Sequence, residues 1–101
     1  MRMLVEIDIP LEPFNTYVRD GTAGEKIGLI LDDLKPEATY FTDLGGSRGA
    51  VIIVDVPEAS AVPSIAEPWF LTFNADVRFR IVMGPEDLEN ADLEGISTKW
   101  G

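Results

Sequence analysis

The order in which alternating and helical stretches follow one another most constrains what this chain can fold into. Residues 3–9 alternate, with apolar side chains on one side and Glu6 and Asp8 on the other, which predicts a strand with one buried face. Residues 76–82 alternate in the same way, with basic side chains on the polar side. The sequence therefore predicts one half-buried strand near residue 3 and another that ends near residue 82.

A hairpin is predicted between these two strands. Residues 37–43 are rich in strand formers, residues 45–47 (Gly-Gly-Ser) are a turn signal, and residues 48–56 form the returning strand. The returning strand carries the aliphatic run 51–54, which predicts burial on both faces and a central place in the sheet.

The first helical stretch, residues 12–34, holds two apolar stripes. One stripe starts at Phe14 and the other at Ile27, and on an unbroken helix they point in nearly opposite directions. The stretch is therefore either broken near Gly21 or buried on two sides. The break is favoured, because Thr22 opens a Thr-x-x-Glu pattern that fits a capping box.

The second helix is predicted over residues 58–67. Pro63 lies about one turn in, so the alternative is a helix that starts near Val62, with Pro63 in its first turn. Pro68 complicates the assignment of the residues that follow. From residue 84 the sequence predicts a short acidic helix, followed by a loose end at residues 99–101.

This order of elements predicts an α+β fold on the ferredoxin-like β-α-β-β-α-β plan: an antiparallel four-stranded sheet followed by a C-terminal helix. The length of 101 residues fits a single domain, with its core in residues 1–83 and an acidic C-terminal segment in residues 84–101. Both helices cover one face of such a sheet. The apolar third strand predicts that a second copy covers the other face, which makes the protein a homodimer.

Composition excludes several functions. The chain has no His and no Cys, which excludes disulfides, thiol nucleophiles, Ser-His-Asp triads and the commonest metal centres, and we expect no metal and no cofactor. The net charge of -10 argues against binding nucleic acid or an anionic membrane. Because Glu6 and Asp8 interrupt the apolar start, no signal peptide is expected, and we predict a cytoplasmic protein.

Three segments resemble the dimeric α/β-barrel superfamily, in which two ferredoxin-like sheets face each other. They are residues 3–7, residues 47–51, and Pro68-Trp69 leading to residues 76–82, within a likeness that covers about residues 1–83. The likeness is strongest to small uncharacterised bacterial domains. More distant relatives include muconolactone-isomerase-like enzymes and cofactor-independent quinone-forming monooxygenases. The resemblance implies a homodimer with a ligand cleft between helices and sheet, but not the His-dependent chemistry of many such monooxygenases.

Charged residues of the first and last predicted strands form the first candidate site. If these strands are neighbours, Glu6, Asp8, Arg78 and Arg80 share one face of the sheet. The arginines suit a carboxylate ligand, and a carboxylate suits the role of general base. The structural alternative, cross-strand ion pairs at an interface or a cleft rim, is favoured, and no residue is assigned a catalytic role.

Polar and aromatic residues form a second candidate site. Asn15, Tyr17 and Arg19 belong to the first helical stretch and are placed near Tyr40 by topology, where they suit a small oxygenated ring. Trp69 suits the wall of an apolar pocket. The favoured alternatives are a solvated helix face for the first group and core or interface packing for Trp69.

Three further signals are weak. Residues 21–26 lack the spacing of a phosphate loop, and the acidic residues 32–33 and the acidic tail lack the spacing of a calcium loop. Trp100 is either docked on a partner subunit or disordered.

Two functions stay open on this sequence. The first is a homodimer that binds a small organic ligand in the cleft between helices and sheet. The alternative is a cofactor-independent isomerase or monooxygenase that acts on a small organic acid or aromatic compound.

Overall fold

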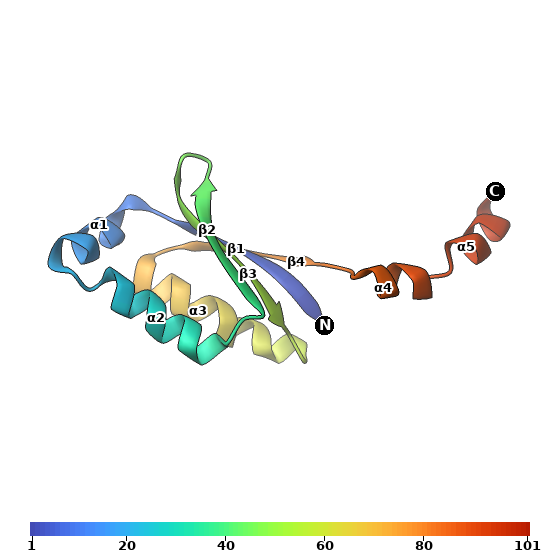
Figure 1. The fold of residues 1–101 in the computed structure, drawn as a ribbon, viewed down its shortest axis with the longest axis horizontal. Helices are drawn as coiled ribbons and strands as arrows, with labels where there is room; N and C mark the ends of the chain where they lie inside the picture. The colour runs from blue at the N-terminus through green and yellow to red at the C-terminus, as the bar shows by residue number, and fades with distance from the viewer.

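The hairpin at the centre of the chain shows how local sequence sets the elements of the computed structural model, which describes residues 1–101. Gly45 and Gly46 have φ of 67° and 90°, the left-handed values that a two-residue hairpin turn needs. The elements are, in chain order (Figure 1), β1 (Arg2–Ile9), α1 (Leu11–Asp20), α2 (Ala23–Leu34), β2 (Ala38–Leu44), β3 (Ser47–Asp55), a 3-10 turn (Ala59–Ala61), α3 (Val62–Phe73), β4 (Asp76–Ile81), α4 (Pro85–Asn90) and α5 (Leu93–Trp100).

The four strands form one antiparallel sheet in the order β2-β3-β1-β4. The aliphatic strand β3 lies inside the sheet, and β1 lies beside β4. In the register of β1, Val5 is opposite Ile52 on one side and Phe79 on the other. The fold is therefore α+β, and its element order and antiparallel sheet are compatible with the ferredoxin-like plan.

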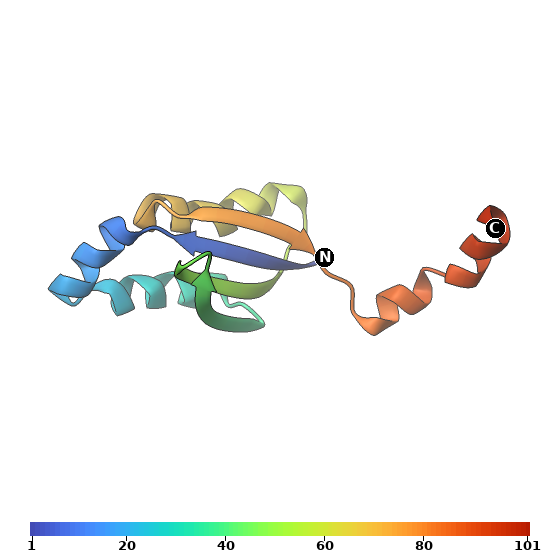
Figure 2. The same ribbon diagram turned by 90° about the horizontal axis from the view of Figure 1, so that it is seen from above.

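The helices α1, α2 and α3 all pack on one side of the sheet (Figures 1 and 2). On that side alternate strand residues such as Ile7 and Ile52 are fully buried. They join Trp69 and Phe73 of α3 and Phe14 of α1 in one core cluster. Because successive side chains of a strand point to opposite faces of the sheet, one set of alternate strand residues faces the core.

The opposite side of the sheet has no element of the chain over it (Figure 2), and we call it the outer face. Its central apolar residues are Leu4, Val51 and Ile53, all only partly buried. The register fixes its members as the remaining strand residues: Arg2, Leu4, Glu6, Asp8, Ala38, Tyr40, Thr42, Leu44, Ser47, Gly49, Val51, Ile53, Asp55, Asp76, Arg78 and Arg80.

The first helical stretch is broken where the sequence favoured a break. Gly21 ends α1 with φ of 84°, which a side chain would strain. The predicted capping box is wrong, because the Thr22 side chain does not cap α2. Its hydroxyl instead donates to a carboxylate oxygen of Asp20 at 2.6 Å, which fixes the connector between the helices.

The predicted end of the second helix is also wrong, because α3 passes through Pro68 and ends at Phe73. Pro68 removes one backbone donor from the helix. The following turn places Trp69 and Phe73, both 0% exposed, in the core. Burial of these two rings outweighs the missing hydrogen bond.

Residues 84–101 form two short helices that project from the body, and we call them the C-terminal arm (Figure 1). The predicted loose end is wrong, since α5 extends to Trp100. Because of the arm, the radius of gyration is 17.1 Å, whereas a compact chain of this length has about 13 Å. No helix, in the arm or elsewhere, has both the length and the apolar character needed to cross a membrane.

Candidate functional site

The four charged residues of β1 and β4 lie together on the outer face, as their alternation and the pairing of the two strands require. Glu6 is directly opposite Arg78, and Asp8 is directly opposite Asp76. Arg80 is opposite Leu4, one step along the same face. The charges therefore flank the apolar centre of the outer face on its β4 side.

These charges are only partly paired. The Arg80 guanidinium lies 3.6 Å from the Glu6 carboxylate, and Arg80 is 70% exposed, so the pair is long and screened by solvent. Asp8 accepts a hydrogen bond from the Ser47 hydroxyl at 3.1 Å. Arg78 is exposed and forms no ion pair. Arg78 thus presents a free fork of donors that suits a carboxylate or another anion.

The structure divides the second candidate group between the two sides of the sheet. The Asn15 side-chain oxygen accepts a hydrogen bond from Arg48 at 2.6 Å. The Tyr17 ring meets Phe73 of the core edge-on, with 6.0 Å between centroids. Tyr40 is on the outer face and 67% exposed, so Tyr40 and Tyr17 are on opposite sides of the sheet.

The last two predicted site residues, Arg19 and Trp69, make contacts away from the outer face. Arg19 pairs with Glu12 at 3.5 Å on the exposed surface of α1. Trp69 is completely buried against Phe73, and its indole N–H has no hydrogen-bond acceptor. Trp69 therefore belongs to the core, and the predicted residues do not form one site.

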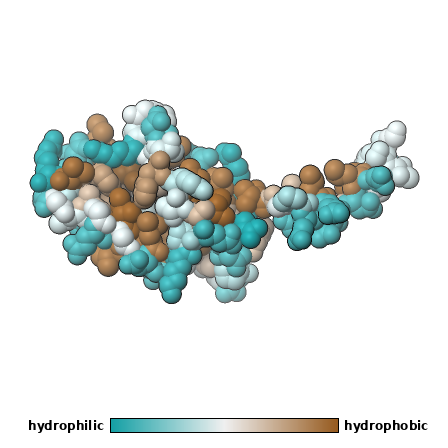
Figure 3. Space-filling model, viewed as in Figure 1, coloured by the Kyte–Doolittle hydropathy of each residue, from teal (hydrophilic) through white to brown (hydrophobic).

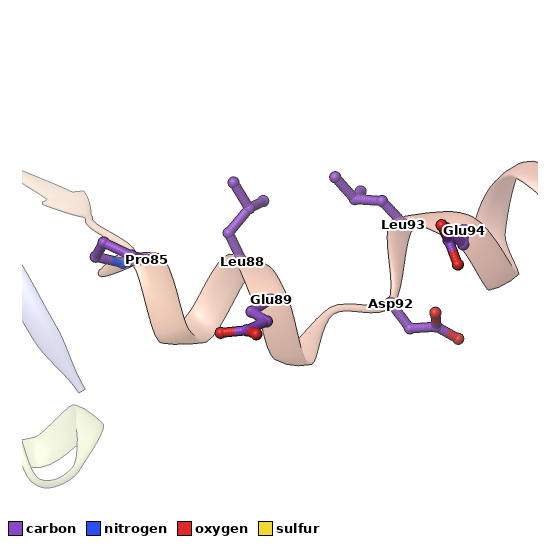
Figure 4. A pocket seen from close by; sticks show the side chains of 6 residues that line it. All are labelled: Pro85, Leu88, Glu89, Asp92, Leu93 and Glu94. Carbon is purple, nitrogen blue, oxygen red and sulfur yellow. The ribbon is translucent and has the colours of Figure 1, made fainter.

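Sequence reasoning missed the one pocket of the structure, which lies in the C-terminal arm (Figure 4). It is an open hollow of about 710 Å³ between α4 and α5. Figure 4 shows Leu88 and Leu93 pointing to one side of the arm and Asp92 to the other. Its lining residues are Pro85, Leu88, Glu89, Asp92, Leu93 and Glu94.

The arm has an apolar side, which is clearest on α5. On α5 the residues Leu93, Ile96 and Trp100 recur at i, i+3 and i+7, which places them on one helix face. Figure 3 shows hydrophobic colour along one side of the arm and hydrophilic colour along the other. This spacing is the signal from which the sequence alone could have predicted α5.

Acidic residues of the arm do not converge on a metal site. No group of three or more His, Cys, Asp or Glu side chains in the structure is placed to hold a metal ion. The chain matches no known family model, and it matches no curated protein.

Proposed function

We propose that this protein functions as a homodimer that binds a small organic anion, with the outer faces of two sheets turned toward each other as in a dimeric α/β barrel. The observation that carries the proposal is the uncovered outer face. Its apolar centre (Leu4, Val51 and Ile53) lies beside the unpaired guanidinium of Arg78. Sheets with one apolar face are stable when another layer covers that face.

The accessible surface supports association of two copies. The chain exposes 6797 Å², whereas a compact monomer of 11.1 kDa exposes about 5,650 Å². The excess of about 1,100 Å² per copy is comparable with the ~800 Å² that each partner buries in a standard interface. One dimer interface would be large enough to bury a surplus of this size.

The ligand class follows from the charges on the outer face. Arg78 offers parallel N–H donors to a carboxylate, and Arg80 lies on the same strand face. In a dimer these groups become partly shielded from water, which strengthens their interaction with an anion. The ligand site of this proposal therefore lies on the outer face and not between helices and sheet, where core side chains fill the space.

Size-exclusion chromatography with light scattering tests the dimer. We expect a mass of about twice 11.1 kDa at micromolar protein. A mass of one chain at every concentration would contradict the dimer.

A thermal-shift screen of small mono- and dicarboxylates tests the ligand. We expect stabilisation by at least one member, and we expect Arg78→Gln to abolish it. Lys26→Gln is the matched control, because it removes one positive charge from α2, where Lys26 lies over the Tyr17 ring. Equal loss in both variants would show a nonspecific charge effect, and no response from any carboxylate would reject the anion site.

A further inference from the structure

The C-terminal arm lacks any contact that explains its sequence. Its four large apolar side chains, Leu88, Leu93, Ile96 and Trp100, are 47%, 57%, 48% and 78% exposed. None of them belongs to the core cluster or packs against it. Two short helices of this length are not stable on their own in water, so their apolar side needs a surface to pack on.

The arm is directed away from its own sheet. Both views show α4 and α5 continuing outward beyond the end of β4 (Figures 1 and 2). The longest dimension of the chain is 60 Å, against 27 Å and 19 Å for the other two. The apolar side of the arm is thus out of reach of the outer face of the same copy.

The charge of the arm indicates which kind of surface it can pack against. Residues 86–94 carry five acids and no base. On the outer face β4 carries one acid, Asp76, and two bases, Arg78 and Arg80. Arg78 forms no ion pair, and Arg80 has one long contact to Glu6. The acidic arm is therefore opposite in sign to the part of the β4 margin that carries Arg78 and Arg80.

We infer that the arm of each copy docks on the second copy of the chain, along the β4 margin of its outer face. The apolar side of the arm packs at the edge of the contact between the two sheets, beside Leu4 of the partner subunit, which lies opposite Arg80 in the sheet. The acids of α4 face Arg78 and Arg80 of the partner subunit. The inference rests on the proposed homodimer. It adds that the dimer is held by reciprocal exchange of arms and not by the sheet faces alone.

The chain contains a built-in probe of this contact. It has only two tryptophans, of which Trp69 is fully buried and Trp100 is 78% exposed. The difference between the emission of the wild-type protein and that of Trp100→Phe therefore reports on Trp100 without disturbing the core. The single-tryptophan variant Trp69→Phe gives the same information directly.

The experiment measures Trp100 emission and acrylamide quenching over a dilution series, with light scattering on the same samples. We expect emission to shift to shorter wavelength, and quenching to fall, in parallel with dimer formation. Trp100→Phe should show no dependence on concentration. A dimer in which Trp100 stays exposed overturns the arm exchange and leaves the sheet-face dimer standing, whereas a monomer overturns both.

A shielded Trp100 at all concentrations, including those at which the protein is monomeric, would show that the arm folds onto its own copy, and this also overturns the inference. Substitution provides an independent measurement. We expect Trp100→Ser to weaken the dimer at least tenfold. The control Leu71→Ser removes an apolar side chain that is 80% exposed on α3 and should leave the dimer unchanged. Equal affinity of both variants would contradict arm docking.

Discussion

Asp20 fixes the connector between α1 and α2 through one neighbour. Its carboxylate accepts hydrogen bonds from the Thr22 hydroxyl at 2.6 Å and from the Thr22 backbone N–H at 3.0 Å. The bond from the Thr22 side chain is the main cause that lowers the pKa of Asp20 below its ordinary value of 3.8, and the backbone bond acts in the same direction.

Because the pKa of Asp20 is lower in the folded chain, the ionised carboxylate favours folding above the unfolded value of 3.8. That contribution is lost as the pH falls through the folded pKa. Thr22→Val removes the hydroxyl donor and should raise the pKa of Asp20 toward its ordinary value. An NMR titration of the side-chain carboxyl carbon measures this shift; an unchanged pKa in Thr22→Val would show that the hydroxyl does not matter.

Trp69 combines a large apolar contribution with an unsatisfied polar atom. Its side chain is 0% exposed, and its indole N–H has no acceptor. Trp69→Ala should lower the free energy of unfolding by about 3–5 kcal/mol, since it leaves a large cavity. Trp69→Phe should cost less than about 2 kcal/mol, because it removes a buried donor whose desolvation costs ~1–3 kcal/mol. Urea denaturation checks both, and a loss in Trp69→Phe as large as that in Trp69→Ala would contradict this prediction.

At the scale of the element, the β2–β3 hairpin depends on a close approach. A Cβ on Gly49 would lie 2.6 Å from Cγ of Leu44, whose side chain crosses over the glycine from the neighbouring strand. Both residues are on the outer face, in diagonal positions of the ladder. The hairpin therefore packs at this point only because residue 49 lacks a side chain.

Gly49→Ala should lower the free energy of unfolding by about 1–3 kcal/mol, because Leu44 must shift. In a Leu44→Ala background the same substitution should cost at least ~1 kcal/mol less, since the clash is gone. A double-mutant cycle by chemical denaturation measures the coupling. Additive effects would indicate strain in the backbone of β3 instead.

Elements set by local chemistry could be predicted from the sequence, and elements set by distant contacts could not. The left-handed glycines at the hairpin turn and at Gly21 mark their breaks directly. Pro68 led to the wrong end for the second helix. The helix continues past Pro68 because Trp69 and Phe73 are buried in the core, and this tertiary contact is not visible in the local sequence.

The same division holds for the candidate site. Glu6 and Arg78 could be placed on one face, because both strands alternate clearly and pair with each other. The run from residue 39 to 42 does not alternate, so nothing in it indicates which face Tyr40 occupies. Tyr40 and Tyr17 were therefore predicted as neighbours although the sheet lies between them.

At the scale of the whole molecule, the small core and the open face lead us to expect that stability depends on association. Only 15 of the 101 residues are buried, so a single copy has little apolar burial to offset its conformational entropy. When folding is coupled to dimer formation, mass action makes the unfolding temperature rise with protein concentration. We expect such a rise for the wild-type chain between low and high micromolar protein.

The variant Val51→Thr/Ile53→Thr separates this effect from the stability of the single copy. Both positions are on the outer face in β3. Threonine keeps the branched shape that a strand favours, while it removes the apolar methyl groups that would contact the second copy in the proposed dimer. The double variant should weaken the dimer at least tenfold and flatten the dependence of the unfolding temperature on concentration. At the lowest concentration, where wild type and variant are both single copies, their unfolding temperatures should converge. Scanning calorimetry over the dilution series measures these unfolding temperatures. An unfolding temperature of the wild type that does not change with concentration would mean that the stabilising contacts of this fold lie within one chain.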